Sequence, residues 1–164
     1  MTYSKRAQNY LTSTMAVTAV IGLLSLSANT TAAECPAAER GPHSMRDAPT
    51  TGKDIKVDVL AQLDLGKEAP HLQNRDLRLR TITFQPGGYV PLHSHDDRPA
   101  IAIVTQGELI EHTPNCKVPI VHHTGDIIRE NKGVSHWVEN TGTTPAVLTV
   151  SDIPDNRITD SPFK

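Results

Sequence analysis

The feature that most constrains the fold of this chain is a succession of short apolar segments separated by turn residues. Residues 77–84 (LRLRTITF) alternate apolar and polar side chains, the pattern of a half-buried β-strand. Turns rich in Gly, Pro and Asn separate the segments, and strands spaced by about 8–12 residues are typical of a sandwich or barrel. The sequence therefore predicts an all-β domain with no helix after residue 33. The other expected strands are 55–65, 89–95, 100–105, 108–112, 118–122, 126–130, 136–139 and 146–151.

Length and composition exclude several other classes of protein. A chain of 164 residues is long enough for one domain, given about 150 residues per domain. A formal net charge of −2 with 37% hydrophobic residues excludes a disordered acidic chain and a strongly basic nucleic-acid binder.

The N-terminus has the three-part layout of a secretory signal peptide, which we assign to residues 1–33. Lys5 and Arg6 precede an apolar run over residues 15–26, and small residues follow at 28–33. The run is shorter than the ~20 residues of a membrane-spanning helix, although an uncleaved anchor is the alternative. We therefore expect an exported protein, periplasmic or extracellular, with no membrane attachment after cleavage. The mature chain would keep 14 basic and 18 acidic residues, which gives no electrostatic reason to bind nucleic acid.

After the signal peptide we expect a flexible N-terminal arm over residues 34–54 and a β-barrel over 55–164. The arm is polar and contains three prolines and two glycines. Cys35 in this arm and Cys116 are candidates for a disulfide, because an oxidising compartment favours one. Two free thiols, or an intermolecular bond through Cys35, are the alternatives.

Histidines on the expected strands indicate a metal site. His93 and His95 are two residues apart, so in a strand both imidazoles point to the same face. His136 begins a later strand and provides a third imidazole. His112 and His122 are expected to be exposed or to hydrogen-bond to other residues rather than to bind the metal.

Two motifs around these histidines resemble those of the cupin family. The first motif, G-x5-H-x-H-x(3,4)-E-x6-G, matches at Gly87, His93, His95 and Gly107, and the second, G-x5-P-x-G-x2-H-x3-N, at Gly125, Gly133, His136 and Asn140. The resemblance covers residues 70–152 and implies a double-stranded β-helix, or jelly-roll barrel, with a divalent metal (Fe, Mn, Ni, Cu or Zn) in its lumen. It also implies pairing of two barrels into a homodimer.

The sequence departs from this pattern at two positions. Asn131 replaces a proline, which affects only a turn, and Ala100 stands where the first motif has a glutamate that binds metal. A three-histidine centre is one interpretation, since three imidazoles with open positions make a workable catalytic site. Replacement by another carboxylate is the second, with Glu130, Glu108 and Glu111 as candidates, and a degenerate site that only binds ligands is the third.

Three neutral imidazoles leave the full charge of the ion, which favours a small anionic ligand. Arg98 lies two residues before Ala100 and is the candidate anchor for a substrate carboxylate, unless it pairs with Asp96 or Asp97. Glu130 is the candidate general acid. The resemblance implies a metal-dependent dioxygenase of the quercetinase-like group of small single-domain cupins. The alternative is a non-catalytic binding module for a small acid or a metal ion.

Overall fold

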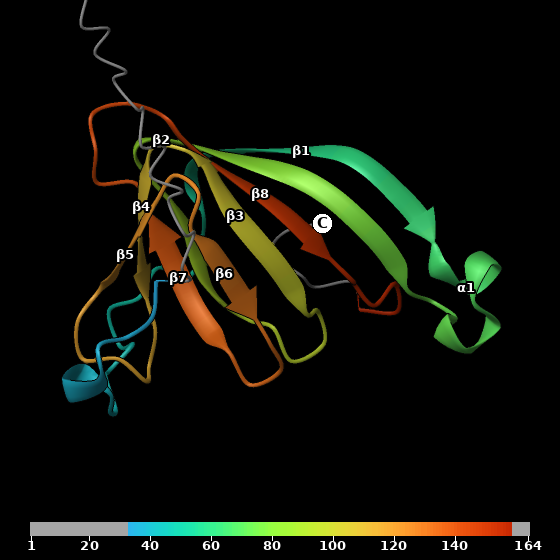
Figure 1. Cartoon of the computed structure of the whole chain (residues 1–164), viewed down its shortest axis with the longest axis horizontal. Coiled ribbons are helices and arrows are strands. Elements are labelled where there is room, and N and C mark those ends of the chain that lie inside the picture. The colour runs from blue at the N-terminus through green and yellow to red at the C-terminus, as the bar shows by residue number, and fades with distance from the viewer. Residues whose placement is uncertain (1–32, 159–164) are drawn as a thin grey trace, which may run out of the picture.

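A computed structural model describes residues 33–158, which form one curled antiparallel sheet (Figure 1). Its path runs β5-β4-β7-β2-β8-β3-β6, and β1 pairs with β2 beside this path. The strands are β1 (Lys53–Asp64), β2 (Asp76–Ser94), β3 (Ala100–Gln106), β4 (Glu108–His112), β5 (Ile120–His123), β6 (Ile127–Glu130), β7 (Ser135–Glu139) and β8 (Ala146–Asp152). The expected all-β jelly-roll barrel is confirmed. Apart from Ala33, the expected signal peptide lies outside the described residues.

The long strand β2 joins the two halves of the barrel. Its first half pairs with β1 on one side and β8 on the other, and its second half pairs with β7. The pairing of β2 with β7 is interrupted by a register shift between Val90 and His93. Two residue pairs lie before this shift and two lie after it. One face of the sheet encloses an aliphatic core with a single phenylalanine, Phe84, which is fully buried.

Two residues of the family motifs build the turns that set the strands in register. Gly107, between β3 and β4, has a φ of +78°, and a Cβ there would lie 3.0 Å from the Cβ of Ala146. A side chain at this position would be strained and crowded at once. Asn140 is buried after β7, and its amide nitrogen donates to the carbonyl oxygens of Phe84 and Thr144 at 3.1 and 2.8 Å.

The expectation of no helix was wrong for three short turns. These are α1 (Leu65–Glu68) and the 3₁₀ turns η1 (Ala37–Glu39) and η2 (Pro70–Leu72). Asp64 caps α1, because its Oδ1 accepts a hydrogen bond from the Gly66 nitrogen at 3.0 Å. One turn of helix is too short to produce a 3.6-residue periodicity, so the pattern could not reveal it. Within residues 33–158, no helix has the length and apolar character needed to cross a membrane.

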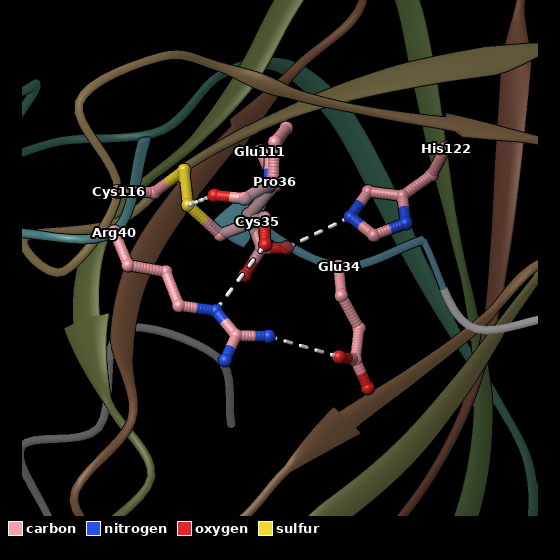
Figure 2. The surroundings of a disulfide bond; sticks show 7 residues. All are labelled: Glu34, Cys35, Pro36, Arg40, Glu111, Cys116 and His122. Atoms are coloured by element: carbon pink, nitrogen blue, oxygen red, sulfur yellow. Dashed lines mark hydrogen bonds and ion pairs between the residues drawn. A yellow bond between two sulfur atoms is a disulfide. The ribbon is translucent and has the colours of Figure 1, made fainter. Parts of the chain in front are cut away.

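The N-terminal arm is tied to the loop between β4 and β5. Cys35 and Cys116 form a disulfide with a Cα–Cα distance of 5.7 Å, which confirms the expected pair (Figure 2). Backbone hydrogen bonds extend the contact, from Gly41 to Asn115 at 3.1 Å among others. Figure 2 also shows Arg40 reaching back along the arm, where its Nε donates to the Cys35 carbonyl oxygen at 3.4 Å.

We predict that this disulfide contributes substantially to stability. The closed loop spans 81 residues, and loss of its chain-entropy effect would lower the free energy of unfolding by about 4.5 kcal/mol at most. Urea unfolding of a Cys35→Ser/Cys116→Ser variant measures the loss. The reduced wild-type protein is the matched control and should unfold with the variant. Equal midpoints for the variant and the oxidised wild type would contradict the prediction.

Candidate metal centre

Three histidines converge inside the barrel. His93 lies near the end of β2, His95 follows that strand directly, and His136 lies on β7 with its Cα opposite that of His93. The Nε2 atom of His95 lies 3.0 Å from the Nε2 atoms of both His93 and His136. Two nitrogens bound to one ion at a right angle, with bonds of about 2.1 Å, would be about 3.0 Å apart. The three side chains that the sequence predicts as ligands therefore offer one shared site, and their donor atoms all lie within 4.8 Å of one another.

Hydrogen bonds on the far side of two rings fix which nitrogen faces this site. Nδ1 of His93 lies 2.9 Å from the Pro91 carbonyl oxygen, and Nδ1 of His95 lies 2.9 Å from that of Arg98. A carbonyl oxygen can only accept, so each Nδ1 donates and each neutral ring has a lone pair on Nε2. Two lone pairs that face each other at 3.0 Å cannot form a hydrogen bond. The arrangement suits a cation held between them, and imidazole nitrogens are suitable ligands for Zn, Cu, Fe and Ni.

Burial keeps His93 and His95 in the neutral form that binds metal. Desolvation, together with the charge of His136, lowers the pKa of His93 to about 2 and that of His95 to about 4. His136 differs, because its pKa is raised. Burial acts to lower it, but the hydrogen bond to Glu111 and the charge of Glu130 outweigh burial.

Glu111, on β4, supports the third imidazole from behind. Its Oε1 lies 2.6 Å from Nδ1 of His136, and its Oε2 lies 2.8 Å from Nε2 of His122 (Figure 2 shows the second contact). All three side chains are buried. Burial acts to raise the pKa of Glu111, but hydrogen bonds from His122 and His136 lower it to about 2. Glu111 thus holds His136, one of the predicted ligands, from the side away from the other two histidines, and sequence reasoning missed this role.

The other two candidate carboxylates lie in different environments. Glu130, on β6, is 4% exposed, with Oε2 3.4 Å from Nε2 of His95 and Oε1 3.6 Å from Nε2 of His136. Burial raises its pKa. Glu108 is exposed on β4 and pairs with His123 at 3.1 Å, away from the three histidines.

Strand β2 also carries two buried arginines, contrary to a simple interpretation of its alternation. Arg78 and Arg80 are 7% and 2% exposed and share the inner face with Phe84, whereas Leu77 and Leu79 are each 38% exposed. The half-buried strand expected over 77–84 is present and its burial alternates regularly, but its inner face begins with arginines rather than leucines. The signal was present: Arg78 and Arg80 have the same even spacing as Phe84.

Asp152, on β8, is the partner of these arginines. Arg78 donates to both of its carboxylate oxygens, at 3.0 and 2.8 Å, and Arg80 lies 3.1 Å from Oδ2. Arg98 is also buried, with Nε 3.8 Å from the same oxygen, so it turns into the barrel. Burial lowers the pKa of Arg80 to about 10, against the charge of Asp152, and leaves the guanidinium charged at neutral pH.

A pocket of about 320 Å³ lies between the N-terminal arm and strand β6. Ala33 and Glu34, at the start of the described residues, line it together with Arg129 of β6 and Glu111. Glu34 and Arg129 pair across it at 3.2 Å. The pocket therefore reaches the carboxylate that supports His136, and the disulfide next to Glu34 holds one of its walls.

Comparison with known proteins agrees with this fold. The family model described as "Cupin domain" matches residues 80–152. An oxalate-binding protein of Thermotoga maritima is 36% identical over 80 residues, which are 49% of this chain and 63% of that protein. An auxin-binding protein of Prunus persica is 32% identical over 84 residues, 48% of this chain and 39% of that protein. The chain thus matches less than two thirds of either relative.

One solved structure extends the comparison beyond the family motifs. The crystal structure of a protein described as a predicted oxalate decarboxylase from Thermotoga maritima is 28% identical. It covers 74% of this chain and 98% of its own, with a TM-score of 0.50. The fold and the histidine cluster define a small cupin domain of the kind that commonly binds a divalent metal. Residues 80–152 therefore form a domain of the cupin superfamily.

We predict that Glu111→Gln destabilises the protein by about 1–3 kcal/mol at pH 7, because two buried imidazoles lose an ionised partner. Since its pKa of about 2 lies below the ordinary value of 4.5, ionised Glu111 stabilises the fold above pH ~4.5. This contribution is lost as the pH falls toward 2. Urea unfolding of both proteins, free of metal, at pH 7 and pH 3 should show the difference shrinking in acid. A difference that is equal at both pH values would contradict the prediction.

Proposed function

We propose that this protein binds a divalent transition metal through His93, His95 and His136 and uses it to bind a small carboxylate anion. The observation that carries the proposal is the pair of Nε2 lone pairs 3.0 Å apart, on His93 and His95, with a third Nε2 beside them. Backbone carbonyl oxygens and Glu111 hold the rings in this orientation. A bound ion would supply a positive charge for carboxylate oxygens and, if redox-active, reactivity toward O₂.

The charges inside the barrel support an anionic ligand. In the cluster around Asp152 and the three histidines, three buried guanidinium groups balance three buried carboxylates when the carboxylates are ionised and the imidazole ligands are neutral. A divalent ion adds two positive charges in a place that water screens poorly. A dianion restores the balance, whereas a monoanion leaves one charge unmatched. The six side chains are Arg78, Arg80, Arg98, Glu111, Glu130 and Asp152.

The relatives support the same chemical class. One of them is named as an oxalate-binding protein and one solved structure as a predicted oxalate decarboxylase. Oxalate is a small dicarboxylate that offers two oxygens to one ion. Together with the charge balance, these names make oxalate the first ligand to test.

Arg98 is the proposed anchor for the carboxylate, as the sequence analysis expects. It is 7% exposed and lies on the segment that leads into β3. Asp152 already has Arg78 and Arg80 at 3.1 Å or less, while Arg98 is farther away at 3.8 Å. A planar guanidinium matches a carboxylate in a bidentate manner, which lysine cannot do.

A metal-dependent oxygenase, as the sequence suggests, is the second candidate function. It uses the same metal site and requires in addition that the bound ion be redox-active. Export to an oxidising compartment belongs to both candidates, and the Cys35–Cys116 disulfide is consistent with it. A non-catalytic metal-dependent binding protein would need the same residues without turnover.

We predict that His93→Ala and His136→Ala each abolish stoichiometric metal binding. Each removes one of three nitrogen donors, and the remaining two do not complete a site. Metal analysis of the purified protein after dialysis, followed by titration with Mn²⁺, Co²⁺ or Zn²⁺, measures the loss. His123→Ala is the matched control, because that histidine is largely exposed and should leave binding unchanged. Metal retained in both variants would contradict the proposal, and native Zn²⁺ would contradict the oxygenase candidate.

We predict that the metal-loaded protein binds oxalate at least tenfold more tightly than formate, and that the metal-free protein binds neither. Arg98→Lys should weaken oxalate binding by about tenfold, equal to 1.4 kcal/mol, with the metal content unchanged. Isothermal titration calorimetry measures the affinities. Because oxalate chelates free metal, the metal content is measured again after each titration. Equal affinities for oxalate and formate would contradict a dianion site.

A further inference from the structure

The glutamate that the first cupin motif places at position 100 has a counterpart on a neighbouring strand. Ala100 of β3 stands opposite Glu130 of β6 in the antiparallel ladder. Residues directly opposite each other have Cβ atoms about 4.5–5.5 Å apart on the same face of the sheet. Both are buried, Ala100 at 7% and Glu130 at 4% exposure, so that face is the inner one. A carboxylate missing from β3 is thus present one strand away.

The carboxylate of Glu130 lies on the metal-facing side of the imidazoles. Its two oxygens lie 3.4 Å from Nε2 of His95 and 3.6 Å from Nε2 of His136. These distances are longer than an ordinary N–H···O hydrogen bond, but they match two ligands of one ion with bonds of about 2.1 Å and a wide angle between them. Both rings already have a partner for Nδ1, in the Arg98 carbonyl oxygen and Glu111. Glu130 therefore differs from Glu111, which contacts the opposite nitrogen.

The small side chain of Ala100 is what makes room for this arrangement. Ala100 also stands opposite Asp152 of β8, so it separates two buried carboxylates in one row across three strands. A glutamate at position 100 would place a third carboxylate between them, and like charges at neighbouring positions repel. Alanine avoids that crowding, and Arg98 approaches Asp152 in the same region.

We infer that Glu130 is the fourth protein ligand of the metal, a cross-strand replacement for the glutamate that the family places at position 100. The inference rests on the proposed three-histidine site and adds a ligand to it. The role also takes Glu130 away from the general-acid function that the sequence suggested. With Glu130 as a ligand, the chain restores a three-histidine, one-carboxylate set from a different strand.

The test is the affinity and visible spectrum of bound Co²⁺ in Glu130 variants. Glu130→Ala and the isosteric Glu130→Gln should both weaken Co²⁺ binding by at least tenfold and change its absorption bands, because one oxygen donor is lost. Moving the carboxylate back, in Ala100→Glu/Glu130→Ala, should return the affinity to within tenfold of wild type. Glu108→Gln is the matched control, since that glutamate is exposed. Circular dichroism and the melting temperature show that each variant is folded.

The possible outcomes separate this inference from the proposed function. If Glu130→Gln binds Co²⁺ as wild type does while His93→Ala does not, Glu130 is not a ligand and the three-histidine site stands. If His93→Ala also binds as wild type does, the proposed function itself fails. A double variant as weak as Glu130→Ala would overturn the cross-strand replacement. Loss in both single variants with recovery in the double variant supports the inference.

Discussion

The candidate centre depends on the hydrogen bonds that hold the outer nitrogen of each imidazole. Two of these bonds go to backbone carbonyl oxygens and one goes to Glu111. They decide the tautomer of His93 and His95, and with it which nitrogen faces the shared site. Because the carbonyl oxygens belong to the backbone at Pro91 and Arg98, the folded chain itself orients the rings before any ion binds.

Several charged side chains are buried around this centre, and each would be costly to bury without a partner. Asp152 pairs with Arg78 and Arg80 of β2, and Glu111 forms hydrogen bonds with both His136 and His122. Asp152, its arginines and Glu111 each have a partner of opposite sign or a hydrogen bond, which is the condition for burying a charge. The centre is therefore lined by charged side chains, and it suits a small charged ligand better than an apolar one.

The N-terminal arm lines a pocket that reaches the buried side chain of Glu111. Its disulfide and backbone bonds hold Glu34 near Arg129, at the pocket that reaches Glu111. β5 and β6 are the two ends of the sheet path, and the arm contacts β6 through the Glu34–Arg129 pair. A covalent tie at this point suits a protein that works where disulfides persist.

Much of the fold could be predicted because its signals are local. All nine expected strands recur near their expected positions, with 77–84 and 89–95 joined in the single strand β2, and Gly107 and Asn140 build turns as their motifs indicate. The spacing of His93 and His95 placed two imidazoles on one face, and the motif that ends at Asn140 supplied His136. The helical turn α1 was missed because four residues produce no periodicity.

The sequence by itself determined the all-β class, the three histidine donors and the cysteine pair, because each of these depends on a short pattern or on a small set of candidates. Only the tertiary structure decided which charged side chains surround the donors. Asp152 comes to lie against Arg78, Glu111 comes to lie behind His136, and Glu130 comes to lie opposite Ala100. These placements depend on register between strands that are far apart in the chain. A one-residue slip in register would reverse every one of these faces, so no local pattern can specify them.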